Sequence, residues 1–162
     1  FQANLAGHEA QFATFMLPLA LLGILVGSAV AMVEGNLKRL LAWSSVAQIG
    51  YILLGAGLET EAGLTASIVH MFNHALAKGA LFLLLDVHQR SGSRWSLLWL
   101  ALLAFSIAGA PLTSGAVAKG LYAAALVDTW QWLLPWLGVS ALATTLLMMR
   151  MLTLLASAMR MA

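Results

Sequence analysis

Five long apolar stretches, separated by short polar turns, constrain the fold of this 162-residue chain more than any other feature. Each reaches or exceeds about 20 residues, the length that an α-helix needs to cross the hydrocarbon core of a bilayer. Only 9% of the residues are charged, whereas a soluble domain carries about 25%. We therefore predict an all-α, polytopic membrane protein in which residues 1–162 form a single bundle of five transmembrane helices. The expected helices are Phe12–Val33, Leu37–Leu58, Ala62–Asp86, Trp95–Val127 and Trp130–Ser157.

The fourth apolar stretch is longer than one span requires, and its middle contains Gly109, Pro111 and Gly115. Proline lacks a backbone N–H and clashes with the preceding helical turn, so a continuous helix is not expected here. We predict that the fourth helix is interrupted between Gly109 and Gly115. Such a break persists at membrane depth only where protein or a water-filled cavity satisfies the freed backbone groups. Before this stretch, we expect His88 to Arg94 to form a polar loop.

The basic residues outside the apolar centres gather at one end of the predicted bundle, whereas the charged residues in the loops at the other end are all acidic. Basic residues favour the inner side of a membrane, so this division predicts that the amino end lies outside. The basic side carries Lys38, Arg39, Arg90, Arg94 and Arg160, and the acidic side carries Glu9, Glu59, Glu61 and Asp128.

Four ionisable residues lie away from the ends of the apolar stretches and are the candidate functional residues. His70, His74 and Lys78 are spaced four residues apart, which places them along one stripe of a helix. Lys119 follows the predicted break. An ionisable group at the bilayer centre costs on the order of 3 kcal/mol, so its presence calls for a partner or a task. Buried lysines and histidines can gain and lose protons as their surroundings change, and these four residues are therefore predicted to relay protons.

Other interpretations of the same residues remain open. The lysines can extend their stems toward the headgroups, and an isolated histidine in a helix is often only a hydrogen-bonding core residue. Two histidines four apart can bind a metal, but no glutamate follows His70, no third ligand is evident, and Lys78 would repel the ion. We expect no metal site.

The sequence offers no motif for an active site or a cofactor of its own. It has no cysteine, and we find no nucleophile–base pair, phosphate-binding loop or cofactor motif. The net charge of +2 comes from scattered basic residues, which does not indicate nucleic-acid binding.

Three segments, Asn36–Gly55, His70–Leu85 and Ala108–Gly120, together resemble the proton-conducting antiporter-like membrane subunits. That family occurs in respiratory complex I, in multisubunit sodium/proton antiporters and in membrane-bound hydrogenases. The resemblance implies two inverted five-helix repeats, each with a broken helix that carries a central lysine or glutamate. This chain would be the second, carboxyl-terminal repeat of a longer subunit, with Lys119 at the central position. A first residue of Phe1 rather than methionine agrees with that expectation.

The resemblance also implies a function and a setting. We expect proton translocation within a complex I-type NADH:quinone oxidoreductase or a related complex, in a bacterial inner membrane. The partners would be other membrane subunits, the lipid bilayer and protons. Two alternatives stay open from the residues: sodium/proton exchange in a multisubunit antiporter, and a structural bundle that braces a larger complex without conducting.

Overall fold

The computed structural model describes the backbone of residues 2–127 and 130–161, and the side chains of residues 12–127 and 130–157. Within these ranges the secondary structure is entirely helical, which confirms the predicted fold class. Four segments are long and apolar enough to cross a membrane: Phe12–Val33, Leu37–Gly57, Glu61–Ser91 and Gln131–Ser157. The helices are α1 (Gln2–Val33), α2 (Leu37–Gly57), α3 (Glu61–Ser91), α4 (Arg94–Ala108), α5 (Ser114–Leu126), the 3-10 turn η1 (Gln131–Leu133) and α6 (Leu134–Met161).

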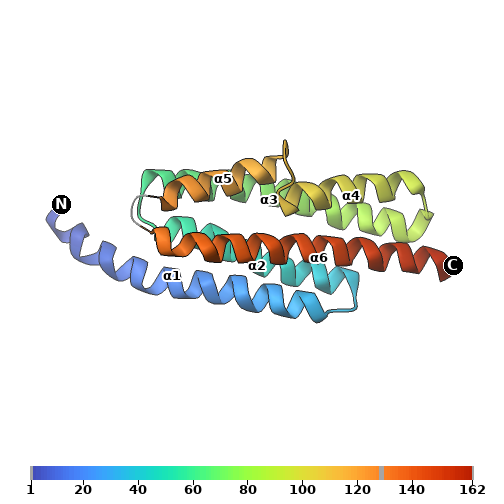
Figure 1. The fold of residues 1–162 in the computed structure, drawn as a ribbon, viewed down its shortest axis with the longest axis horizontal. Coiled ribbons are helices and arrows are strands. Elements are labelled where there is room, and N and C mark those ends of the chain that lie inside the picture. Colours follow the sequence, from blue (N-terminus) through green and yellow to red (C-terminus); the bar gives the residue numbers. More distant parts are fainter. Residues whose placement is uncertain (1, 128–129, 162) are drawn as a thin grey trace.

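The chain runs the length of the bundle five times, and α4 and α5 together make the fourth pass (Figure 1). These two helices have 15 and 13 residues. At 1.5 Å per residue each is about 20 Å long, which is shorter than the roughly 30 Å of a hydrocarbon core. The predicted interruption of the fourth helix is therefore confirmed.

Two glycines make the break between α4 and α5 possible. Gly109 ends α4 with a φ of 87°, in the left-handed region that residues with a Cβ seldom adopt. Its N–H donates to the carbonyls of Phe105 (3.2 Å) and Ser106 (3.1 Å). Gly115, in the first turn of α5, lies so close to Ser106 that a Cβ would overlap the Ser106 carbonyl oxygen. The two half-helices thus meet through backbone contacts that larger residues would block.

The expected loop from His88 to Arg94 is wrong, because α3 continues to Ser91 and only two residues separate it from α4. Two contacts extend the helix beyond its expected end at Asp86. Arg90 Nε lies 2.8 Å from Asp86 Oδ2, an ion pair one turn apart. The buried ring of His88 is hydrogen-bonded through Nδ1 to Ser96 Oγ of α4 at 2.7 Å. Polar residues in this segment therefore stabilise the helix rather than end it.

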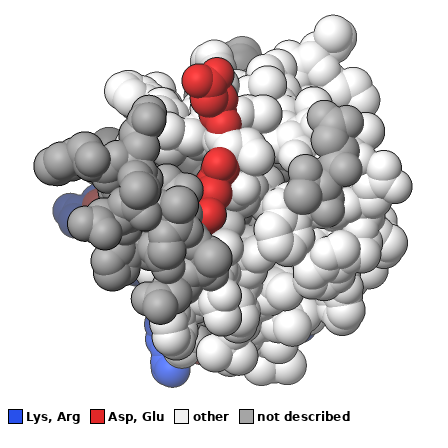
Figure 2. Space-filling view, turned by 90° about the vertical axis from the view of Figure 1, so that its left-hand side faces the viewer, with Lys and Arg blue, Asp and Glu red and all other residues white. Residues whose placement is uncertain are grey.

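The charged side chains lie at opposite ends of the bundle. At one end, Lys38 Nζ lies 3.5 Å from Asp86 Oδ1, and Arg39 Nε lies 3.2 Å from Glu34 Oε2. Figure 2 looks onto the other end, where acidic side chains face the viewer and basic ones are seen only at the margin. Glu59 and Glu61 belong to this end and are exposed. The expected turn residue Asp128 and the side chains of Glu9 and Arg160 lie outside the described residues.

The buried apolar side chains form two clusters, one toward each end of the bundle. The cluster at the basic end includes Leu41, Ala77, Ala108 and Leu147. The cluster at the acidic end includes Tyr51, Ala66, Tyr122 and Leu137. On α2, α3, α5 and α6, polar residues lie between the two clusters or at their border. We call this set the central polar layer; it comprises Ser44, Gln48, His70, His74, Lys78, Lys119, Ser140 and Thr144.

Candidate functional site

Lys78 is buried between α3 and α2, with 4% of its surface exposed. Its ammonium donates to the backbone carbonyl of Leu41 at 3.0 Å and to the hydroxyl of Ser44. Both acceptors belong to α2, so the lysine side chain reaches across the helix interface instead of toward the end of α3. The alternative in which Lys78 extends to the headgroups therefore does not describe its position.

The rings of His70 and His74 stack one turn apart on α3, with centroids 6.3 Å apart and an interplanar angle of 3°. His70 is almost fully buried. Its ring also lies against Tyr51 of α2 and Tyr122 of α5, each at 5.6 Å between centroids.

The ring nitrogens of this pair have few protein partners. Neither nitrogen of His70, nor Nδ1 of His74, has a hydrogen-bond partner among the described residues. Buried polar atoms in native proteins are almost always hydrogen-bonded, either to protein or to water. These three nitrogens are therefore suited to exchange hydrogen bonds and protons with water or a neighbouring group.

Lys119 lies beside the helix break, as the sequence predicts. Its ammonium donates to the carbonyl oxygen of Ala108, the last residue of α4, at 2.5 Å. The last carbonyls of a helix have no partner within the helix and carry the negative end of its dipole. The interrupted helix thus supplies an acceptor for a cation at the centre of the bundle, which a continuous helix would not.

The structure brings the four predicted residues together in a definite order. Lys78 lies one turn from His74 on α3, and the ring of His74 stacks on that of His70. His70 in turn lies against Tyr122, which is three residues from Lys119 on α5. The four residues thus form a row in space. It begins with Lys78 at the interface of α3 with α2, continues through His74 and His70, and ends with Lys119 on the broken helix. Periodicity places the first three on one stripe, but only the packing of α5 against α3 adds the fourth.

The sequence did not predict that a second group of polar residues, on α2 and α6, would be hydrogen-bonded to each other. Tyr51 is hydrogen-bonded to Ser140, and Gln48 Nε2 donates to Thr144 Oγ1 at 3.4 Å. The spacing of Gln48 and Tyr51 on one helix, and of Ser140 and Thr144 on another, could have indicated two polar faces. These pairs line the side of the central polar layer that lies toward α6.

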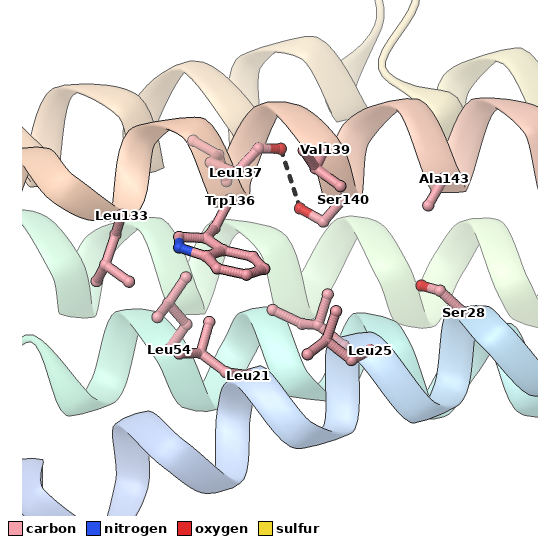
Figure 3. A pocket seen from close by; sticks show the side chains of 11 residues that line it. Leu21, Leu25, Ser28, Leu54, Leu133, Trp136, Leu137, Val139, Ser140 and Ala143 are labelled. Atoms are coloured by element: carbon pink, nitrogen blue, oxygen red, sulfur yellow. Dashed lines mark hydrogen bonds between the residues drawn. The ribbon is translucent and has the colours of Figure 1, made fainter.

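An apolar pocket of about 60 Å³ lies between α1, α2 and α6. Figure 3 shows the indole of Trp136 reaching across it toward α1 and α2, while Ser140 points to the Leu137 carbonyl, to which it donates at 2.9 Å. Apart from Ser28 and Ser140, the lining is almost wholly hydrocarbon. The pocket therefore offers little to an ion and is separate from the four ionisable residues.

The histidines do not form part of a recognisable metal site in the part of the chain that the structure describes. No group of three or more His, Cys, Asp or Glu side chains there could hold an ion. Lys78 acts electrostatically on His74, which disfavours a second positive charge between them.

Comparison with known proteins identifies relatives over most of the chain. Residues 3–148 match the family described as NADH:quinone oxidoreductase/Mrp antiporter, TM. NADH-quinone oxidoreductase subunit N of Desulforamulus reducens is 30% identical over 149 residues, which cover 82% of this chain and 31% of that protein. The Acinetobacter baumannii protein of the same name is 34% identical over 139 residues, covering 75% of this chain and 28% of that protein.

A shorter match has a higher sequence identity. NADH-quinone oxidoreductase subunit N of Desulforudis audaxviator is 47% identical over 64 residues, which cover 40% of this chain and 13% of that protein. The chain thus spans less than a third of the length of these curated relatives. The family match, together with the apolar helices, agrees with the resemblance inferred from the three sequence segments. The chain belongs to the NADH:quinone oxidoreductase/Mrp antiporter transmembrane family and is a multi-pass membrane protein.

Proposed function

We propose that this chain carries protons across part of the membrane within an antiporter-like subunit, through Lys78, His74, His70 and Lys119. The observation that carries the proposal is the row of these four groups at the centre of an apolar bundle: the rings of His70 and His74 stack, and Lys78 lies one turn beyond His74 on α3. At the other end of the row, His70 lies against Tyr122, which is three residues from Lys119 on α5. Each can hold a proton in one state and release it in another. Water between the unpartnered ring nitrogens and the ammonium groups would complete the path.

Electrostatic repulsion couples the protonation of neighbouring groups in the relay. A positive charge on one group disfavours a proton on its neighbour, so a change at one end alters proton binding at the next group. Two unit charges 4 Å apart interact with about 4 kcal/mol at an effective dielectric constant of 20. Moving one charge through 100 mV involves about 2.3 kcal/mol. Small displacements of one charge are therefore sufficient to drive or stop the next step.

The chemistry of the layer favours protons over sodium. Sodium needs oxygen ligands, and the ionisable members of the layer are amines and imidazoles, which attract protons and repel metal cations. The buried charged and polar side chains within the described residues include no carboxylate. Sodium/proton exchange is the alternative that this composition disfavours.

The proposal extends to the setting of the chain. We infer that it is part of a longer subunit, because it corresponds to under a third of its relatives, and that it forms the carboxyl-terminal repeat, because its three resembling segments fit that repeat. Its partners are other membrane subunits of an NADH-quinone oxidoreductase or a related complex, as the names of the relatives suggest. The membrane is the bacterial inner membrane, and the positive-inside rule places the acidic end, with the amino end of α1, outside.

The test is replacement of Lys119 by alanine in the full parent complex. Removing the ammonium takes away a proton carrier and the donor to the Ala108 carbonyl. The Gly109 N–H still donates to the carbonyls of Phe105 and Ser106 at the end of α4, so complex assembly should be unchanged. The initial rate of proton translocation in membrane vesicles should fall by about tenfold or more. Lys38→Ala is the matched control, since it removes the same charge from an exposed site outside the layer.

The possible outcomes separate the three functions. Loss of translocation in Lys119→Ala but not in Lys38→Ala supports the relay. Unchanged proton translocation in Lys119→Ala would remove the lysine from the mechanism and favour a bracing role. Translocation that depends on added sodium in the unmodified complex would favour sodium/proton exchange.

A further inference from the structure

A polar patch lies on the outer surface of the bundle beside the helix break. Ser114 of α5 donates to Asn73 Oδ1 of α3 at 2.5 Å, and the hydroxyls of Ser106 and Ser114 are 3.2 Å apart. The neighbouring residues Pro111 and Leu112 are exposed. We call these five residues the break patch.

Several hydrogen-bonding atoms of the break patch have no partner within the described residues. The side-chain amide of Asn73 has two N–H donors, and no contact satisfies either of them. The carbonyl oxygens of Pro111 and Leu112 likewise accept no hydrogen bond. The patch therefore presents both donors and acceptors on its outer side.

Leu112 makes the patch project from the bundle. Its φ is 68°, a left-handed conformation that costs a residue with a Cβ roughly 1 kcal/mol or more. Its side chain is fully exposed. Figure 1 shows the connection between α4 and α5 extending beyond the surrounding helices. An apolar side chain in a strained backbone at the tip of a connection contributes nothing to the core of this bundle.

The depth of the patch excludes lipid as its cover. The break separates half-helices of similar length, so it lies near the middle of the membrane. Hydrocarbon cannot satisfy exposed N–H and C=O groups, and irregular backbone does not occur at this depth in contact with lipid.

Large apolar side chains around the patch argue against water as its cover. Leu102 and Phe105 on α4, Val117 on α5 and Leu76 on α3 are all exposed. Leu102, Val117 and Leu76 lie four, three and three residues from Ser106, Ser114 and Asn73, so they border the polar atoms at helical spacing. A surface that mixes unpaired polar groups with exposed leucine and phenylalanine suits a protein neighbour.

We propose that the break patch is the docking surface for a transmembrane helix that lies outside these 162 residues. The helix presents small residues opposite Leu112, which let the two backbones approach, and an asparagine or glutamine at mid-depth. Such an amide accepts from Asn73 and donates to the Pro111 or Leu112 carbonyl. The proposal rests on the position of the chain in the membrane and does not depend on proton transfer.

The test uses a photo-reactive benzoylphenylalanine in place of Leu112, in the full complex in native membranes. The control places the same probe at Leu142, an exposed residue of α6 in the middle of its helix. Irradiation should join position 112 to one apolar helical peptide, identified by mass spectrometry, in higher yield than position 142. Adducts to lipid alone at position 112, or equal yields of the same peptide at both positions, would overturn the proposal.

A cysteine at the same place distinguishes a protein cover from water. These 162 residues contain no cysteine, so Leu112→Cys introduces a single thiol within them, and its labelling is read on the peptide that carries it. With a helix on the patch, this thiol should react with a water-soluble methanethiosulfonate at least tenfold more slowly than the thiol of Glu59→Cys, which is exposed at the end of the bundle. Equal rates would show that the break opens to water and would contradict the docked helix.

Asn73→Leu tests the polar part of the contact. It removes the side-chain donors while keeping an apolar residue of similar size on the surface of α3. The cross-linking yield at position 112 should fall several-fold. An unchanged yield would show that Asn73 does not hold the helix and would overturn the hydrogen-bonded contact.

Discussion

The ammonium of Lys119 is hydrogen-bonded to the carbonyl oxygen of Ala108, across the gap that separates α5 from α4. This contact exists because α4 ends at Ala108 and leaves its last carbonyls free. The lack of a side chain at Gly109 leaves room for the lysine stem, since a Cβ there would lie 2.9 Å from Lys119 Cδ. The helix break and the buried lysine are thus one structural feature, and a change in either should alter the other.

We predict that Gly109→Ala destabilises the protein. A Cβ at this position would lie 2.9 Å from Lys119 Cδ, and the φ of 87° is unfavourable for alanine. The backbone conformation alone costs about 1–2 kcal/mol. Thermal unfolding of the purified protein should show a lower midpoint.

Gly120→Ala is the matched control for this substitution. Gly120 lies within α5 and has no atom within 4 Å of its Cβ position. Alanine favours the helix by up to about 1 kcal/mol there, so the midpoint should stay or rise. Equal midpoints for the Gly109→Ala and Gly120→Ala variants would contradict the role of Gly109.

We also predict that α1 and α2 depend on Gly50 for their close packing. A Cβ at Gly50 would lie 2.7 Å from the carbonyl oxygen of Ala20 and 2.8 Å from the backbone nitrogen of Ile24. Neither atom can move without shifting α1, and such overpacking costs about 1–3 kcal/mol. Gly50→Ala should therefore unfold at a lower denaturant concentration than the wild type.

Gly23, on the facing helix, provides the comparison. The nearest atom to its Cβ position is Gly50 Cα at 3.6 Å, an ordinary van der Waals distance. Gly23→Ala should be tolerated. If both variants lost stability equally, the contact would be as tight at Gly23 as at Gly50.

Replacement of Lys78 by methionine should separate function from folding. Methionine has a similar length and no charge to bury, and Ser44 keeps its own hydrogen bond to Leu41, at 2.9 Å. Stability should change by less than about 1 kcal/mol or rise, as when buried ionic groups give way to apolar ones. Proton translocation by the parent complex should fall.

Lys78→Ala supplies the structural comparison, since it leaves a cavity and should cost about 2 kcal/mol or more. A normal rate of proton translocation in the methionine variant would mean that Lys78 only anchors α3 to α2. The measurements are denaturant unfolding and dye-reported acidification of vesicles.

The sequence predicts the features of this fold that depend on local chemistry. Gly109 and Gly115 mark the break because each fits a backbone that other residues cannot adopt or approach. The spacing of His70, His74 and Lys78 puts them on one stripe because the helix period is fixed. The extension of α3 past Asp86 was not predicted, since polarity was taken to end the helix, whereas the Asp86–Arg90 ion pair and the His88–Ser96 contact stabilise it.

The missing parts of the site depend on contacts between distant segments. Tyr51 and Ser140 are 89 residues apart, and Gln48 and Thr144 are 96 apart. Either polar face could be recognised on its own helix, but no local pattern states that the faces of α2 and α6 meet. The sequence predicts that Lys119 lies beside the break, but it does not identify the Ala108 carbonyl as its hydrogen-bond partner.

The most direct test of the account compares proton translocation by Lys78→Met, Lys119→Ala and the double variant in the reconstituted parent complex. If the lysines act in series along one path, the double variant should be no slower than the slower single variant. Rates that fall by the product of the two single effects, or single variants that translocate protons normally, would contradict a relay through the central polar layer.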